Sequence, residues 1–146
     1  MTNTEQKTEL TKEQALEKFL NSGIEKAEET RIENEFECNG ETYIVLTDEE
    51  ADAAAAQDIE LSLWSYNASF LAGYMPEGIS EDDVNSIRGD RCEDANGAII
   101  ALVNAGRGLE TLIEAAIGLD GRGHCLAHHD GEEHESECGT FYFYRV

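Results

Sequence analysis

The stretch GRGHCLAHHDGEEHESECGTFYFYRV, residues 121–146, holds all four histidines of the chain and two of its four cysteines. Its last residues, TFYFYRV, are mostly of types that favour β-strands. The pair Asp130-Gly131 is typical of a two-residue turn between antiparallel strands. We therefore predict that residues from about 123 to 146 supply strands of an antiparallel sheet.

A second β signal covers residues 31–47. In RIENEFEC, the side chains of Ile32, Phe36 and Cys38 share one face of an alternating pattern, and glutamates occupy the other face. Asn39-Gly40 follows, a strong turn signal because both residue types tolerate positive φ. ETYIVLT is the return strand. These residues predict a β-hairpin that joins the C-terminal strands in one sheet.

The remaining patterns indicate helices. Thr11 with Gln14 has capping-box spacing, in which each side chain bonds the backbone N–H of the other residue, and so does Thr47 with Glu50. Apolar residues recur at helical spacing in the middle of the chain. The helices predicted to cover one face of the sheet lie near 48–66, 92–105 and 109–118.

The element order predicts an α+β fold, with an antiparallel sheet made of an N-terminal hairpin and C-terminal strands. We expect residues 1–10 to be a flexible N-terminus and residues 11–146 to form a single α+β domain. Ser80 with Asp83 predicts one further short helix. Residues 24–30 are compatible with either a helical extension or a linker.

Charge is the extreme feature of the composition. The chain has 32 acidic and ten basic residues and a formal net charge of −22. Such a charge repels nucleic acid and anionic membranes and attracts basic surfaces. We therefore predict no direct binding to nucleic acid or membranes, and a basic protein as partner. Solubility alone, or adaptation to a high-salt organism, would also account for the charge.

Location follows from what the sequence lacks. The N-terminus, MTNTEQKTEL, has no apolar run of the kind found in secretory signals, and no segment approaches the roughly 20 apolar residues that span a bilayer. The cysteines do not have the spacing of a disulfide framework. We expect a cytoplasmic protein with reduced thiols.

Three stretches together resemble a known group of proteins: YIVLTDEEADAAAAQDIELSLWSYNASFLAGYM, CEDANGAI, and GLDGRGHCLAHHDGEEHE with FYFYRV. They are similar to small uncharacterised acidic proteins of tailed bacteriophages, which end in GRGHxLxxxDGxExE and an aromatic tail closing on Tyr-Arg. The resemblance covers residues 43–146 and implies a phage origin, and hence a location in the host cytoplasm, without implying an activity. The matching positions are Gly121, Arg122, Gly123, His124, Leu126, Asp130, Gly131, Glu133, Glu135, Tyr144 and Arg145.

The histidines and cysteines of the tail raise the question of zinc. Cys125, His128, His134 and Cys138 have nearly the dimensions of a zinc knuckle, and thiolate and imidazole are suitable ligands. A hairpin turning at residues 130–131 would argue against the site. In a regular strand, Cys125 and His129 would lie on one face about 13 Å apart, and His128 would point to the opposite face. We predict no bound metal and no cofactor, and a zinc-stabilised small domain is the alternative.

Catalysis has one candidate residue, His124, which we expect at the start of a strand, because histidine can transfer protons near neutral pH. No nucleophile or metalloprotease motif accompanies it, so we predict no catalytic residues and no enzyme activity. The simplest role for Arg122 and Arg145 is internal pairing with carboxylates.

The leading functional hypothesis is that the chain is an acidic binding protein. It would engage a basic host protein, acting as a nucleic-acid mimic or as an inhibitor. Helical carboxylates three or four residues apart are about 5–6 Å apart, a spacing suited to a basic groove. The sequence does not predict an oligomeric state. The carboxylates expected to contact the partner are Glu49, Glu50, Asp52, Asp58 and Glu60.

Overall fold

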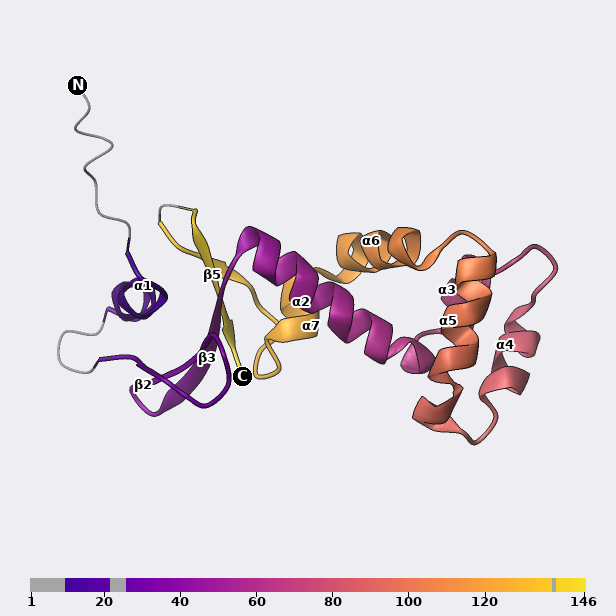
Figure 1. The fold of residues 1–146 in the computed structure, drawn as a ribbon, viewed down its shortest axis with the longest axis horizontal. Helices are drawn as coiled ribbons and strands as arrows, with labels where there is room; N and C mark the ends of the chain where they lie inside the picture. Colours follow the sequence, from indigo (N-terminus) through magenta and orange to yellow (C-terminus); the bar gives the residue numbers. More distant parts are fainter. Residues whose placement is uncertain (1–9, 22–25, 138) are drawn as a thin grey trace, which may run out of the picture. The chain divides into compact units, whose positions relative to one another are not determined.

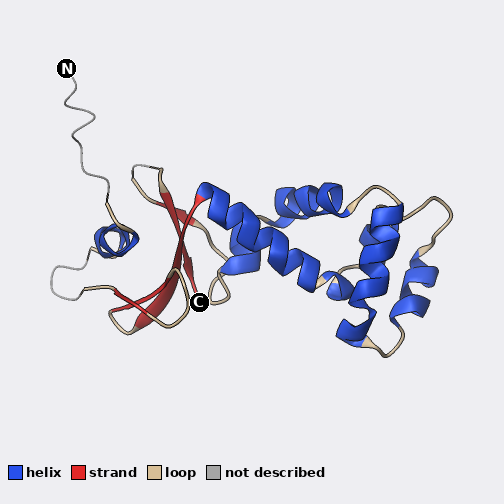
Figure 2. Ribbon diagram, in the orientation of Figure 1, coloured by secondary structure: helices blue, strands red, loops and turns tan. Residues whose placement is uncertain are grey.

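The computed structural model describes residues 10–21, 26–137 and 139–146. By their contacts these residues divide into two compact units, drawn in Figures 1 and 2. The sheet unit runs to Asp52 and resumes over Leu126–Val146, and the helical unit is Ala53–Cys125. That residues 11–146 fold as one domain stays a prediction.

The sheet unit confirms the predicted α+β class. Within the described residues its antiparallel sheet has five strands in the order β1-β2-β3-β5-β4, so the N-terminal hairpin and the C-terminal strands share one sheet. The central pair is β3 and β5, with Val45 opposite Phe143. The strands are β1 (Glu28–Glu29), β2 (Glu35–Cys38), β3 (Glu41–Thr47), β4 (His134–Glu135) and β5 (Phe141–Arg145).

The predicted N-terminal hairpin forms with its turn at Asn39 and Gly40, whose φ values are 57° and 77°. The prediction that Ile32 shares a strand face with Phe36 and Cys38 is wrong, because Ile32 precedes the strand and is 60% exposed. The reason is a tight turn before β2, in which Asn34 has a φ of 66° and the N–H of Glu35 donates to the carbonyl of Ile32. Asparagine tolerates this left-handed conformation, so the strand begins only at residue 35.

Helix α1 (Lys12–Phe19) covers one face of this sheet (Figure 1). Its predicted capping box between Thr11 and Gln14 is present. Leu16 is fully buried, and the ring of Phe19 stacks on Phe143 with centroids 4.5 Å apart. The buried core on this face consists of Ala15, Leu16, Ala27, Phe36, Cys38, Tyr43, Val45 and Phe143.

The C-terminal strands begin later than predicted. Residues 122–126 form a short helix, α7 (Arg122–Leu126), so the predicted hairpin across Asp130-Gly131 is wrong. Gly131 does have a positive φ of 73°, but its N–H donates to the carbonyl of Ala127, four residues back. A glycine in this conformation closes a helical turn as readily as a hairpin. The β4–β5 turn begins instead at Ser136, whose N–H donates to the carbonyl of Phe141.

The helical unit contains the helices predicted for the middle of the chain. Its core is formed by side chains with no exposed surface, including Leu63, Val84, Ile99 and Leu112. No helix within the described residues combines the length and apolar character needed to cross a membrane. The elements are the part of α2 (Asp48–Leu61) after residue 52, η2 (Leu63–Ser65), α3 (Ala68–Ala72), α4 (Glu81–Arg88), η3 (Cys92–Ala95), α5 (Asn96–Ala105), α6 (Leu109–Asp120) and most of α7.

Candidate functional site

Glu50, predicted to contact a partner, has contacts within the framework of the sheet unit. Its Oε1 accepts hydrogen bonds from the Nζ of Lys12 at 2.7 Å and from the N–H of Thr47 at 2.9 Å. These two contacts, Lys12 first, lower the pKa of the Glu50 carboxyl below its ordinary value. The predicted capping box is confirmed, and the contact with Lys12 explains why this carboxylate is only half-exposed.

The other four predicted carboxylates are divided between the units. Glu49 and Asp52 are exposed in the sheet unit. In the helical unit Glu60 is exposed, and Asp58 is half-buried. Burial raises the pKa of Tyr66 to about 12, and the charges of Cys125, Asp120 and, last, Asp58 add to this effect.

A denser group of carboxylates, missed in the sequence analysis, lies on α4, η3 and the turns beside them. All of its members are exposed. Three of them begin α4, where Ser80 and Asp83 form the predicted capping box. The signal that could have identified this group was local acid density, since seven of the 18 residues at positions 77–94 are acidic. We call it the acidic segment: Glu77, Glu81, Asp82, Asp83, Asp90, Glu93 and Asp94.

Both arginines of this stretch are engaged with main-chain carbonyls. The guanidinium of Arg88 donates to the carbonyl of Trp64 at 3.0 Å and to that of Tyr66. Arg91 donates to the carbonyl of Ile87. With seven carboxylates and two guanidinium groups, residues 77–94 have a formal net charge of −5. The partners that the described residues give these two arginines are neutral main-chain carbonyls and the side-chain amide of Asn85.

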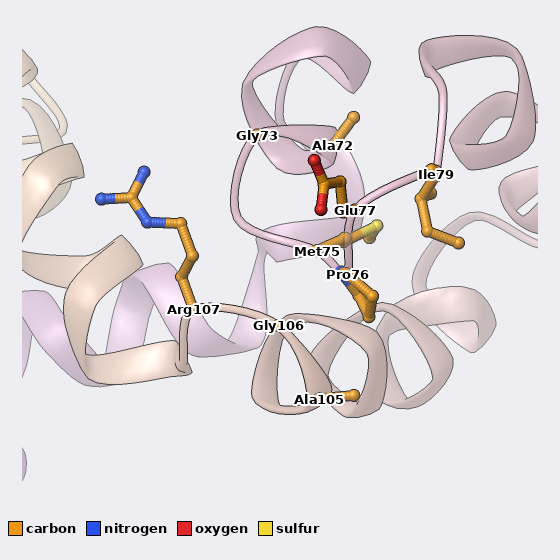
Figure 3. A pocket seen from close by; sticks show the side chains of 10 residues that line it. Ala72, Gly73, Met75, Pro76, Glu77, Ile79, Ala105, Gly106 and Arg107 are labelled. Carbon is orange, nitrogen blue, oxygen red and sulfur yellow. The ribbon is translucent and has the colours of Figure 1, made fainter.

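A surface pocket of about 630 Å³ adjoins the acidic segment (Figure 3). It lies between the α3–α4 connection and the α5–α6 connection, and Glu77 lines it. The two connections meet backbone to backbone: the N–H of Arg107 donates to the carbonyl of Tyr74 at 2.9 Å. A Cβ atom at Gly106 would lie 2.4 Å from the carbonyl oxygen of Tyr74, so only glycine fits there.

The C-terminal tail, residues 121–146, places its candidate residues in a short helix, turns and strands. His124 is exposed and lies in α7, so its predicted place at the start of a strand is wrong. Arg145 pairs with Glu41 at 3.2 Å, as the sequence predicted for internal pairing. The hydroxyl of Tyr144, which is fully buried, donates to Glu133.

Four further tail positions are explained by their local geometry. Gly121 caps α6 with a φ of 83°, and Gly123 is buried within α7. Arg122 is half-buried in the same short helix. Asp130 accepts a hydrogen bond from the N–H of Glu132 in the turn that Gly131 closes.

The alternative zinc ligands are poorly suited where they can be described. Cys125 is buried, and this burial raises the pKa of its thiol to about 11, an effect to which Asp58 and Asp120 add. Zinc binds the thiolate, so a thiol that resists deprotonation is a weak ligand. His128 is exposed in the turn after α7, and Cys138 lies outside the described residues.

Within the described residues, Asp130, Glu132 and His134 have potential ligand atoms within 4.8 Å of one another. The Nε2 of His134 lies 3.7 Å from the Oε2 of Glu132, and its ring packs 5.2 Å from the ring of Phe19. Both carboxylates are exposed. An acidic surface turn beside a histidine has this geometry without an ion, so we assign no metal to it.

Comparisons with protein-family models, with curated proteins and with solved structures find no match for the chain.

Proposed function

We propose that this chain is an acidic binding protein that engages the basic surface of a host protein and competes with nucleic acid for that surface. The observation that supports the proposal best is the acidic segment. It places exposed carboxylates on neighbouring turns, while both arginines of the same stretch bond to main-chain carbonyls. The phage-like tail makes a host protein the natural partner.

The physical reason is the similarity between this surface and a nucleic-acid backbone. Duplex DNA presents one negative charge per roughly 1.7 Å of axis, and proteins bind it with clustered lysine and arginine. A dense group of carboxylates attracts the same basic groove and raises the rate of encounter. It needs no base readout, so the partner would be recognised through its charge and shape. Because exposed charges are screened over about 8 Å at physiological ionic strength, such binding weakens with salt.

The test uses the full chain to capture proteins from nuclease-treated bacterial lysate at low salt, followed by measurement of the affinity of the captured partner. The segment variant is Asp90→Asn, Glu93→Gln and Asp94→Asn, which leaves the capping box of α4 intact. The matched control is Glu110→Gln, Glu114→Gln and Asp120→Asn, which removes as many exposed charges from α6 of the same unit.

We expect a basic partner that is released by high salt and by duplex DNA, and that binds the control variant more tightly than the segment variant. Equal loss of affinity in the two variants would indicate a nonspecific effect of net charge and would contradict the proposal. So would the absence of a basic partner at low salt, which would leave solubility as the reason for the charge.

A further inference from the structure

We infer that the pocket between the α3–α4 and α5–α6 connections receives one lysine or arginine side chain of the basic partner. The inference rests on the proposed function and adds a defined contact to a surface otherwise recognised by charge. Its basis is that the pocket combines an apolar floor with a negative polar end, and is held in shape by backbone contacts.

Two features of the pocket favour a cation, one on each of its two walls. The carboxylate of Glu77 is exposed and lines the pocket, and Figure 3 shows it between Gly73 and Pro76. Helix α5, ten residues long, ends at Ala105, which also lines the pocket. The C-terminal end of a helix carries partial negative charge on its last carbonyl groups and favours a cation. Both features therefore select a positively charged group.

The floor suits the stem of a long basic side chain. Met75 is 4% exposed, and Pro76 and Ile79 are half-buried along the same connection. Lysine and arginine bury their methylene stems against apolar surface while the charged end stays near water or a carboxylate. A short polar side chain of a partner would not reach across these apolar residues. A purely apolar side chain would cover them but would form no ion pair with Glu77.

Arg107 also lines the pocket but is engaged elsewhere. Its guanidinium lies over the ring of Tyr74, 4.5 Å from the ring centroid. Figure 3 shows the side chain directed away from Glu77. A cation–π contact of this kind holds the guanidinium to one side. The carboxylate end of the pocket is thus left to the cation of a ligand.

The pocket is formed in the free chain. The close approach at Gly106 and the hydrogen bond from the Arg107 N–H to the Tyr74 carbonyl join its two walls. The N–H of Ile79 donates to the carbonyl of Pro76 and shapes the turn that carries Glu77. A preformed site loses less conformational freedom on binding than one that must be ordered.

The experiment is an NMR titration of the ¹⁵N-labelled full chain with three matched peptides. They are acetyl-Gly-Lys-Gly-amide, its norleucine analogue, which has a similar stem without the charge, and its glutamate analogue. The amide signals of Gly73, Gly78 and Gly106 report on the pocket because these glycines line it. We expect the lysine peptide to shift these signals and to bind more tightly than the other two.

The variant arm compares Glu77→Gln with Glu114→Gln, an exposed carboxylate on α6 outside the pocket. Glu77→Gln should weaken lysine-peptide binding by about fivefold, the change expected for one partly exposed ion pair, and Glu114→Gln should leave it unchanged. Equal binding of the norleucine peptide, tighter binding of the glutamate peptide, or equal weakening in both variants would overturn the inference.

Failure of this inference can be separated from failure of the proposed function. If the captured partner still binds in a salt-sensitive manner and Glu77→Gln has no effect on either partner or peptide, the pocket assignment is wrong and the acidic surface stands. If the lysine peptide enters the pocket but no basic partner is captured at low salt, the proposed function is wrong.

Discussion

The ammonium group of Lys12 lies 2.7 Å from the Oε1 of Glu50, 38 residues further along the chain. The same ammonium donates to the Oδ1 of Asn34 at 2.6 Å. One cation therefore joins the start of α1, the turn before β2 and the start of α2. Because the Lys12 side chain is only 21% exposed, this contact is better shielded from water than an ordinary surface ion pair.

The first prediction concerns this contact. Lys12→Met keeps most of the side-chain volume but removes the charge and both hydrogen bonds. We expect the free energy of unfolding, measured by urea titration followed by circular dichroism, to fall by about 1 kcal/mol. The control is Lys18→Met, because Lys18 is 61% exposed and pairs with Glu137, which is 84% exposed. An equal loss in both variants would show that the Lys12 contact has no special weight.

The second prediction is the pH dependence that Glu50 contributes. The folded-state pKa of its carboxyl is lowered from an ordinary value of 4.5, first by Lys12 and then by Thr47. A lowered pKa gives stability that is present above the unfolded value and is lost as the pH falls through the folded value. Between about pH 6 and about pH 3, the unfolding free energy of Glu50→Gln should therefore fall less than that of the unchanged protein.

Glu49→Gln is the matched control for this pH effect, because it removes a neighbouring charge and leaves the Lys12 contact intact. The fall for Glu50→Gln should also be smaller than the fall for Glu49→Gln, which keeps the Lys12 contact. A Glu50→Gln profile that coincides with that of the unchanged protein would contradict the assignment of the carboxyl.

Local signals predicted where elements begin. The Thr11, Thr47 and Ser80 caps each bond to the backbone three residues later, as their spacing indicated. The Asn39-Gly40 turn likewise formed because both residues adopt positive φ. These predictions succeed because the interacting groups are neighbours in the chain, so the sequence contains both partners within a few residues.

Contacts between distant residues could not be predicted in the same way. Nothing local to Lys12 indicates Glu50, and nothing local to Arg88 indicates the carbonyl of Trp64. The hairpin predicted at Gly131 was wrong for a different reason. A glycine with positive φ is compatible with the end of a helical turn as well as with a hairpin, so the residue type alone does not distinguish them. The pocket forms where the α3–α4 connection meets the α5–α6 connection, so the sequence of neither connection predicts it.

The third prediction concerns a side chain that bridges two helices of the helical unit. The Oδ1 of Asn96 accepts from the N–H of Trp64 at 2.9 Å, and its Nδ2 donates to the carbonyl of Glu60 at 2.8 Å. Asn96→Ala leaves both backbone groups without this partner and should lower the unfolding free energy by about 1–3 kcal/mol. Fluorescence of the single tryptophan, Trp64, reports the transition.

Asn104→Ala is its control, because the Asn104 Oδ1 accepts one hydrogen bond, from the N–H of Leu109, in an exposed position. We expect its cost to be smaller than that of Asn96→Ala. The reverse order would mean that the bridge to residues 60 and 64 contributes little.

The fourth prediction is that purified protein binds no stoichiometric zinc. The Cys125 thiol is buried with its pKa raised to about 11, so forming its thiolate is costly near neutral pH. Metal analysis of protein prepared without chelators measures this directly. One zinc per chain, lost in a Cys125→Ser/Cys138→Ser double variant, would reverse the conclusion and favour the zinc-stabilised alternative.

The last prediction tests the backbone contact that forms the pocket. A Cβ atom at Gly106 would lie 2.4 Å from both the carbonyl oxygen of Tyr74 and the carbonyl carbon of Met75, and neither backbone atom can move without shifting its connection. Gly106→Ala should therefore lower the unfolding free energy by about 1–3 kcal/mol, the usual cost of forcing extra atoms into a packed contact. Gly118→Ala is the control, since a Cβ there meets nothing within 4 Å and the position lies inside α6. It should raise stability by about 0.5–1 kcal/mol, because alanine is the better helix former. Urea titration followed by Trp64 fluorescence distinguishes the two signs, and a stabilising Gly106→Ala would show that the two connections do not meet as described.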